Sequence, residues 1–357
     1  MNLNESPPIS INLESLKVSV IICCYTMERL NDIKEAVESV LNQTLKPHEV
    51  ILAIDHNKEL FRKLVETYRD SIEIRRKFPN LNGSQPISIK IVLNTGAPGI
   101  SVTRNLGIRT ATGHFIAFMD DDAIADKNWL EILIRNLSQN PSAAVIGGKC
   151  ILIWPKEKRP LWFAEELDWI VGGTYKGMPV SSNGQIRNVS GCNMLATKEL
   201  FEKAGLFSTR IGAVAGFLRG AEEAEMCLRL KKAFPEKPIL YEPEAIVHHK
   251  VHLHRLTLGY IIRRSFDEGF SKAKVQKLHR RTLSTQQTLD SRLRTFDSGL
   301  STEHSYLRYL FFTSIPERLR HFYQKSSFLQ AATIIISIAA TGAGYLIGKI
   351  KTQNLEP

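Results

Sequence analysis

The chain has 357 residues, of which 43% are hydrophobic and 23% are charged, as in a globular protein of one large or two ordinary domains. A formal net charge of +11 favours polyanionic ligands or an anionic membrane surface, without choosing between them. Five scattered cysteines with no zinc-site spacing exclude a disulfide framework and predict a reducing compartment.

The first half of the chain predicts alternating strands and helices. A β-rich apolar run at 18–24, a helical stripe at 31–43 and a second apolar run at 49–54 form one strand–helix–strand unit. Further helices are predicted at 59–69, 100–110, 129–137 and 221–233, and further strands at 87–93, 114–119 and 189–196. Parallel units of this kind bind ligands beyond the carboxyl ends of their strands. The fold class is therefore α/β, with its site at that edge.

The segment from Ile151 onward has a different character. Proline and glycine interrupt a long stretch that is rich in Trp and Tyr. Loops of this length in compact domains usually carry function, so the segment is predicted to form a wall or lid of the site.

The C-terminal part predicts a membrane anchor. Residues 328–348 contain no charged side chain, and a spanning helix needs about 20 such residues. A buried core helix is the alternative. Because no signal peptide precedes the large domain, that domain is expected in the cytoplasm, held by a single C-terminal pass.

A basic stretch precedes this anchor. Between Lys250 and Arg281, nine Lys or Arg residues stand against two acidic ones. Near a membrane such a face attracts anionic lipid, but a solvated helix face explains the same composition.

The most informative motif is the acidic triplet Asp120, Asp121 and Asp122. It ends an apolar run, 114–119, that is predicted to be a strand. Three adjacent carboxylates repel one another, and hard oxygen ligands suit Mg²⁺ or Mn²⁺, which commonly bridge to a substrate phosphate. A solvated acidic turn is the alternative.

Other polar groups are predicted to converge on the same edge. Asp55 follows the second strand, and Glu222–Glu223 and His248–His249 fall where strands or turns end. Transfer from a nucleotide-linked donor needs acids to hold a nucleoside and a metal, and a base to accept the proton of an acceptor hydroxyl.

The ordered motifs resemble glycosyltransferase family 2, whose members are inverting enzymes with the GT-A fold. The matching runs are VSVIICCYTMERL, Asp55, GISVTRNLGIRTATG, FMDDDA, AEEAEMCLRL and YEPEAIVHH. Within the family, CYTMERL, AVESVLNQT, FMDDDA, the EEAEMC run and HHKV are similar to the prokaryotic glucosyl-dolichyl phosphate glucuronosyltransferases.

The resemblance implies a role for each matched residue. The residues implied to bind the nucleotide are Tyr25, Asp55, Arg104, Asn105, Asp120 and Asp121. The implied metal ligands are Asp122 and His249, and the implied catalytic base is Glu223. Because the family usually has Gly-Glu-Asp at this position, Glu222 is an alternative base. The implied reaction moves a sugar from a nucleotide-sugar, UDP-glucuronate or a UDP-hexose, to a polyprenyl- or dolichyl-phosphate-linked sugar or another glycan.

The domain boundaries follow from these assignments. Residues 1–16 form a tail, 17–250 a GT-A catalytic domain with a mixed sheet, 251–325 a basic helical or linker region, and 326–350 the membrane helix. The expected partners are the donor, the acceptor and the membrane, without nucleic acid. Three alternatives remain: transfer of another sugar in cell-surface polysaccharide synthesis, a nucleotidyltransferase, whose glycine-rich phosphate loop does not follow 18–24, and a non-catalytic basic module that binds anionic lipid.

Overall fold

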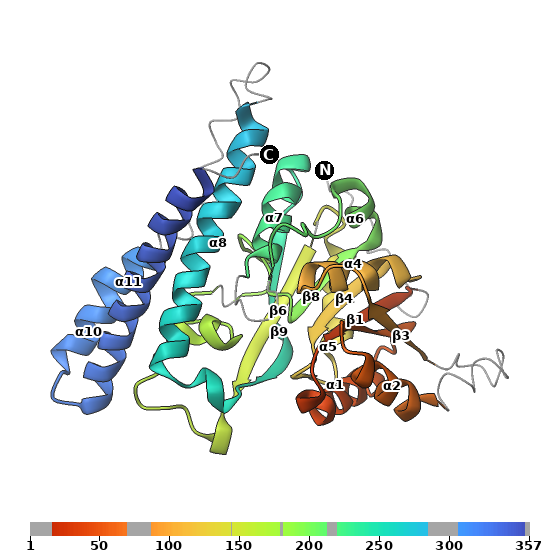
Figure 1. Ribbon diagram of the computed structural model, residues 1–357, viewed down its shortest axis with the longest axis horizontal. Coiled ribbons are helices and arrows are strands. Elements are labelled where there is room, and N and C mark those ends of the chain that lie inside the picture. Colours follow the sequence, from red (N-terminus) through yellow and green to blue (C-terminus); the bar gives the residue numbers. More distant parts are fainter. Residues whose placement is uncertain are drawn as a thin grey trace, which may run out of the picture.

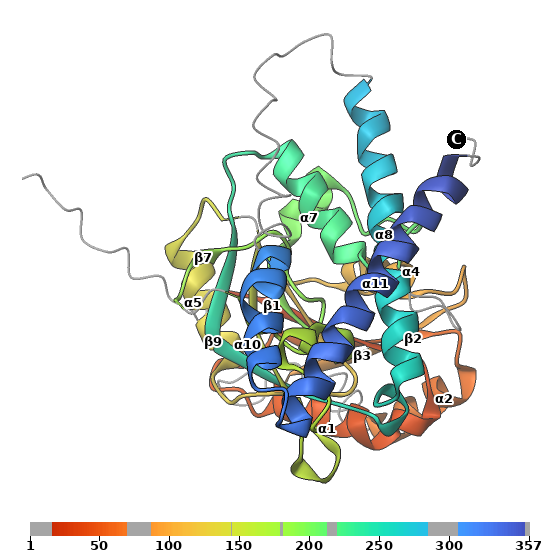
Figure 2. The ribbon, with the colours of Figure 1, turned by 90° about the vertical axis from the view of Figure 1, so that its left-hand side faces the viewer.

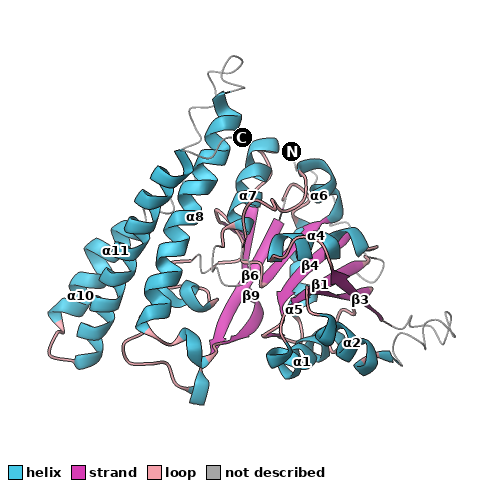
Figure 3. Cartoon of the chain, in the orientation of Figure 1, coloured by secondary structure: helices cyan, strands magenta, loops and turns pink. Residues whose placement is uncertain are grey.

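The computed structural model describes residues 16–69, 87–143, 145–178, 181–212, 220–284 and 306–353. A twisted sheet with helices on both faces forms the body, and two long helices lie side by side along one flank (Figure 1, Figure 3). Residues 1–15 of the predicted tail (1–16) and residues 285–305 lie outside the described residues.

The N-terminal half is a parallel βαβ arrangement, as predicted. Its strands are β1 (Val18–Cys24), β2 (Glu49–Asp55), β3 (Ser88–Asn94) and β4 (Phe115–Asp120), in the order β3-β2-β1-β4. Its helices are η2 (Met27–Arg29), α1 (Leu30–Leu41), α2 (Lys58–Thr67) and α4 (Ile100–Thr110). The carboxyl ends of four neighbouring strands therefore meet at one edge of the sheet.

The second half makes the sheet mixed. β8 (Asn193–Thr197) runs antiparallel to β4 and to β6 (Val145–Ile153), and β6 runs parallel to β9 (Ile239–Lys250). The order continues β4-β8-β6-β9-β5, where β5 spans Ala123–Ala125, and β7 (Gly184–Gln185) pairs with β9. The helices are α5 (Trp129–Gln139), α6 (Lys198–Ala204) and α7 (Glu222–Ala233). The prediction of a mixed α/β sheet flanked by helices is confirmed.

Several boundaries differ from the sequence-based expectation. The strand predicted at 189–196 begins only at Asn193, because Ser190 and Gly191 form a tight turn before it. Strands β6 and β9 were not predicted, and the histidines expected after a strand lie inside β9. The segment after Ile153 holds only short 3-10 turns, η3 (Pro155–Glu157) and η4 (Glu165–Val171).

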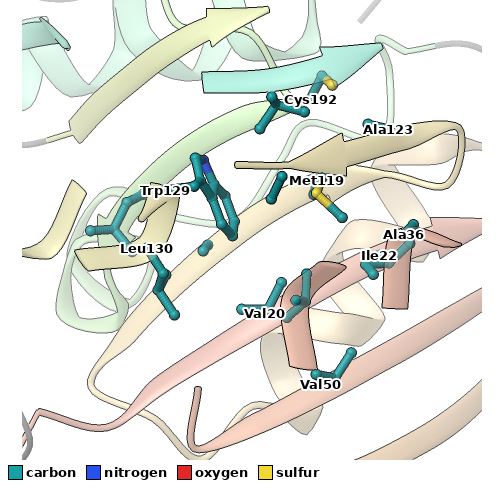
Figure 4. Close-up of a cluster of buried hydrophobic side chains, with 14 of the residues drawn as sticks. Val20, Ile22, Ala36, Val50, Met119, Ala123, Trp129, Leu130 and Cys192 are labelled. Atoms are coloured by element: carbon teal, nitrogen blue, oxygen red, sulfur yellow. The ribbon is translucent and has the colours of Figure 1, made fainter. Parts of the chain in front are cut away.

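Two apolar clusters fill the two faces of the sheet. Figure 4 shows part of the first, in which Val20, Ile22 and Met119 face α1 and α5. The second gathers Phe118, Phe201 and Phe207 beneath α6 and α7. Since neighbouring side chains of β4 alternate between these clusters, both faces of the strand are buried and its polar end is held rigidly.

The C-terminal helices form a layer of their own. After η5 (Leu253–Arg255), α8 (Leu258–Ser284) lies along α11 (Lys325–Gln353), and η7 (Leu310–Ser314) and α10 (Ile315–Arg320) precede α11 (Figure 2). Ser265 and Ser337 are hydrogen-bonded at 2.8 Å across the helix pair. Within α11, the stretch Lys325–Lys351 is long and apolar enough to cross a membrane, and 33% of its most apolar window is buried inside the molecule.

Candidate active site

The acidic triplet lies at the carboxyl edge of the parallel strands. Asp120 ends β4, and Asp121 and Asp122 form the turn into β5. The side chain of Asp120 is 35% exposed, whereas those of Asp121 and Asp122 are 3% and 1% exposed. The triplet is therefore not a solvated acidic turn, because ionisable groups are buried only where partners hold them.

Arg29 is one such partner. Its guanidinium lies 2.6 Å from Asp121 Oδ1 and 3.0 Å from Asp122 Oδ2. Burial raises the pKa of Asp121 to about 7, although the charge of Arg29 opposes the rise. The ion pairs fix the turn that presents Asp120 at the surface.

The two oxygens of Asp122 have different surroundings. Oδ2 also lies 3.2 Å from His252 Nε2 and 3.4 Å from a guanidinium nitrogen of Arg255. Oδ1 is buried without a hydrogen-bond partner, 3.2 Å from His249 Nε2. Burial disfavours the anion, but the charged partners, His249 first among them, hold the pKa of Asp122 well below its usual range. Asp122 is thus an anion with one oxygen available to a cation.

His249 reaches the triplet from the neighbouring strand. β9 pairs with β5 so that His249 lies opposite Ala123, and its Nε2 is 3.8 Å from Asp120 Oδ2. The imidazole is buried, and its Nδ1 makes no hydrogen bond within the described residues. Gly172, at φ +97°, packs so closely that a Cβ there would lie 2.8 Å from His249 Nε2.

These groups fit a divalent cation. Asp120, His249 and Cys192 each offer one ligand atom, and the three atoms lie within 4.8 Å of one another. The unpartnered Asp122 Oδ1 borders the same group. Carboxylate oxygen and imidazole nitrogen are ordinary ligands of Mn²⁺ and other divalent metals.

Arg104 connects the triplet with the acidic start of α7. Its Nη1 lies 2.9 Å from Oε1 of Glu222 and 2.9 Å from Oε1 of Glu223, and its Nη2 lies 3.9 Å from Asp120 Oδ1. The backbone N–H of Gly191 donates to Glu223 Oε1 at 3.1 Å. The buried guanidinium of Arg104 therefore sets the spacing between Asp120 and the two glutamates.

The two glutamates differ in access, and Glu222 is the more deeply buried. The side chain of Glu223 is 17% exposed, whereas that of Glu222 is 7% exposed, with Oε2 buried and unpartnered. Burial and the neighbouring charge of Glu223 raise the pKa of Glu222 to about 8, against the opposing charge of Arg104. Glu222 therefore holds its proton at neutral pH, and Glu223 is the more accessible carboxylate.

Asp55 ends β2 on the far side of β1 from Asp120. Its two oxygens accept hydrogen bonds from Asn94 Nδ2 at 2.8 Å and from the Gly99 N–H at 2.9 Å. Since β2 and β4 flank β1, the two aspartates are about two strand spacings apart, roughly 10 Å. The edge can hold a ligand that spans both carboxylates.

The remaining predicted nucleotide-binding residues have contrasting environments. Tyr25 follows β1, is 53% exposed, and has the Arg29 guanidinium 5.1 Å from its ring centroid. Asn105 is buried, and its amide exchanges two hydrogen bonds with the backbone of Phe207, at 2.8 and 2.9 Å. The Asn105 side chain thus fixes the loop after α6, and its nucleotide role stays a prediction.

Sequence reasoning missed the residues that surround the triplet. Arg29, His252 and Arg255 pair with its carboxylates, and Cys192 approaches Asp120 from the turn before β8. Gly191, in the same turn, packs against Arg104 and Glu223. Arg29 stands in the ERL run, at the end of η2, but only the topology brings η2 and the triplet together. Lys250 and Arg255, which belong to the basic stretch before the predicted anchor, form ion pairs with acids of this region.

The fold and the site define a GT-A glycosyltransferase. The model of the family described as Glycosyl transferase family 2 matches residues 19–205. The chain is 30% identical, over 95% of its length and 98% of the relative's, to the glucosyl-dolichyl phosphate glucuronosyltransferase of Haloferax volcanii. The chain belongs to glycosyltransferase family 2.

Two further similarities agree with this assignment. The succinoglycan biosynthesis protein ExoM of Rhizobium meliloti is 25% identical over 74% of this chain and 78% of its own. The mannosyltransferase of Pyrobaculum calidifontis, solved with GDP-mannose and Mn²⁺, matches with a TM-score of 0.53 at 17% identity, covering 91% of this chain and 87% of the other. At that identity the second match shows the fold alone.

Proposed function

We propose that this glycosyltransferase moves a sugar from a UDP-sugar to a lipid-linked acceptor, with inversion at the anomeric carbon and with a divalent cation. The observation that carries the proposal is the contact set of Arg104, which joins Asp120 of the metal group to Glu223. A leaving diphosphate needs a cation and an acceptor hydroxyl needs a base, on opposite sides of one sugar.

The metal group would consist of Asp120, Asp122 and His249. A bound Mn²⁺ or Mg²⁺ would neutralise the charge that develops on the departing diphosphate. Asp122 supports this role because its Oδ1 is buried without a hydrogen bond and lies 3.2 Å from His249 Nε2, the other proposed ligand. Arg29 and Arg255 hold its other oxygen and so fix the orientation of the carboxylate.

Glu223 is proposed as the base. Both of its hydrogen bonds, from Arg104 and Gly191, are accepted by Oε1, so Oε2 is the oxygen that faces an acceptor hydroxyl. Glu222 is the poorer candidate, since it is more deeply buried and retains its proton to about pH 8. General-base assistance of this kind contributes typically about 10²–10⁴-fold to the rate.

The nucleotide would lie across β1 between Asp55 and the triplet. The exposed Tyr25 ring just after β1 offers a surface on which the nucleobase can stack. Asp55 offers a carboxylate that can accept hydrogen bonds from the polar edge of the nucleobase. Arg104 and Asn105 both lie on α4. Arg104 would place its positive charge near the diphosphate, and Asn105 would hold the loop after α6 in position.

The donor and the acceptor are proposed from the relative in Haloferax volcanii, which covers nearly the whole chain. UDP-glucuronate is the proposed donor, and a sugar on a dolichyl or polyprenyl phosphate is the proposed acceptor. Such an acceptor lies in a bilayer, which agrees with the apolar α11 and with Phe311, Phe312 and Phe322, each more than half exposed beside it. The catalytic domain would then face the cytoplasm from a single C-terminal anchor.

The direct test is a donor screen. The full-length protein in detergent would be incubated with UDP-glucuronate, UDP-glucose or other UDP-sugars, Mn²⁺ and a lipid extract that contains polyprenyl-linked sugars. We expect a metal-dependent glycolipid with UDP-glucuronate, and its loss when EDTA is present. Transfer only from another UDP-sugar would refute the donor, and metal-independent transfer would refute the role of the triplet.

A further inference from the structure

Cys192 lies beside the metal group, although the proposed transfer does not require a thiol. The register that pairs Met119 with Asn193 places Cys192 opposite Asp120. Cys192 is 3% exposed and belongs to the same buried cluster as Met119 and Ala123, which flank the triplet. Figure 4 shows its side chain at the end of this cluster, near both residues. The buried Sγ of Cys192 lies within 4.8 Å of a ligand atom of Asp120 and of His249.

The spacing of the ligand atoms matches a shared ion. Ligands that each lie about 2.0–2.3 Å from one cation are separated by roughly 3.3–4.6 Å. The ligand atoms of Asp120, His249 and Cys192 are within 4.8 Å of one another without any ion present. Small side-chain movements would bring the three atoms onto one cation.

A second observation also indicates a ligand at this place. Asp122 is 99% buried, and its Oδ1 makes no hydrogen bond, although His249 Nε2 is only 3.2 Å away. A buried carboxylate oxygen without a donor is costly unless a cation completes its surroundings. Asp122 Oδ1 thus adds a buried oxygen beside His249, which itself belongs to the three-residue group with Asp120 and Cys192.

We propose that Cys192 is a thiolate ligand that lets this site hold a thiophilic cation of the Zn²⁺ or Cd²⁺ class, together with Asp120 and His249. The inference rests on the proposed function in one respect: the same site is proposed to bind Mn²⁺ or Mg²⁺ during sugar transfer. On binding, the S–H bond of Cys192 breaks, the sulfur pair forms the metal–sulfur bond, and the proton leaves to solvent without any change of oxidation state.

The ligand set predicts which cations compete. Thiolate ligands select soft and borderline metals, whereas Mn²⁺ and Mg²⁺ prefer oxygen, and Zn²⁺ binds mixed sites more tightly than Mn²⁺ does. A tetrahedral Zn²⁺ with three protein ligands has one coordination position left for a diphosphate. A six-coordinate Mg²⁺ with the same ligands has three positions left. Zn²⁺ and Cd²⁺ are therefore expected to displace Mn²⁺ and to inhibit transfer.

The test uses the purified full-length protein, reduced and freed of metal, and Cd²⁺ alone as the probe. Cd²⁺ bound to a thiolate gives a charge-transfer band in the ultraviolet that oxygen or nitrogen ligation does not give. We expect the band to saturate at one equivalent in the wild type. In Cys192→Ser the band should vanish and Cd²⁺ affinity should fall at least about tenfold, since even outer-shell changes cost 10–100-fold.

Matched variants separate Cys192 from the other thiols. Cys150 is hydrogen-bonded to Cys192, so Cys150→Ser tests whether the neighbouring sulfur is the ligand, and it should keep the band. Cys227 is fully buried in the cluster beneath α7, and Cys227→Ser should behave like the wild type. Binding of Mn²⁺, followed by its paramagnetic resonance, should be nearly unchanged in Cys192→Ser, which also shows that this variant is folded.

Two outcomes would overturn the inference: a band that persists in Cys192→Ser, or no band in a wild-type protein that binds Mn²⁺. Loss of Mn²⁺ binding in Cys192→Ser together with a lowered unfolding temperature would assign the thiol a packing role instead. A failed sugar-transfer assay leaves the cadmium measurement intact, so failure of the proposed function and failure of this inference are distinguishable.

Discussion

His249 Nε2 lies 3.2 Å from Asp122 Oδ1, and the contact depends on the short strand β5. β5 continues directly from the triplet and pairs antiparallel with β9, which carries His249. The chain thus folds its acidic turn back onto a strand from the end of the domain. This pairing brings Asp120, Asp122 and His249, the proposed metal group, together, so the group forms only when the sheet is complete.

Asp122→Asn is expected to weaken metal-dependent UDP binding by at least about tenfold, because a neutral amide oxygen is a poorer ligand and because Arg29 and Arg255 each lose one anionic partner. Calorimetric titration of UDP with and without Mn²⁺ measures the effect. Asp126→Asn is the matched control, since the Asp126 side chain is 45% exposed and pairs with the partly exposed His248. An unchanged metal dependence in Asp122→Asn would exclude Asp122 as a ligand.

Glu223→Gln is expected to lower turnover by about 10²–10⁴-fold while nucleotide affinity survives, because the amide still accepts the Arg104 and Gly191 hydrogen bonds but cannot take a proton. Glu222→Gln should keep most of the activity. Initial rates and UDP affinities of both variants decide between the glutamates. The reverse pattern would make Glu222 the base.

The sequence was sufficient for the strand–helix–strand half and for the triplet. The apolar runs that end in Asp55 and Asp120 are short, rich in β-forming residues and followed by a polar residue. Their positions as strands, and the carboxyl edge of the sheet that they share, could therefore be predicted. The runs that became β6 and β9 contain Gly147, Gly148 and Pro243, which weaken a strand pattern read without its neighbours.

The surroundings of the triplet could not be predicted, for a different physical reason. Arg29 and Arg255 look like surface residues in the sequence, because nothing local indicates a buried carboxylate partner. Only the pairing of distant strands gives them one. The same holds for Arg104, which was assigned to the nucleotide and whose guanidinium contacts Glu222, Glu223 and Asp120.

The pH dependence of stability should report on Glu222. Its pKa is raised in the folded protein from the usual 4.5 to about 8, so between these values the folded state binds more protons than the unfolded state. The contribution of Glu222 to stability therefore falls as pH rises through this window and is constant above it. Glu222→Gln removes the titration while keeping a hydrogen bond to Arg104. We expect the variant to gain stability relative to the wild type from pH 5 to pH 8, measured by urea unfolding; a constant difference would contradict the raised pKa.

Gly191→Ala should abolish most activity without unfolding the protein. A Cβ at Gly191 would overlap Arg104 Nη2 and Glu223 Oε1, so the guanidinium and the base must both move. A displacement of this size near the reacting groups costs on the order of 10²-fold in rate. Gly259→Ala is the control, because a Cβ there meets nothing within 4 Å. Equal activity of the two alanine variants would show that the Arg104–Glu223 contact does not set the geometry.

Two glycines of α11 test whether the helix packs on α8. A Cβ at Gly344 would overlap the Phe266 carbonyl of α8, whereas one at Gly342 meets nothing within 4 Å. Gly344→Leu should therefore push the helices apart and lower the unfolding temperature of the detergent-solubilised protein, since overpacking costs about 1–3 kcal/mol. Gly342→Leu should leave the temperature nearly unchanged and should strengthen retention in membranes during alkaline extraction. If α11 crosses the bilayer away from α8, both leucine variants will unfold alike and both will be retained, because neither glycine then faces another helix.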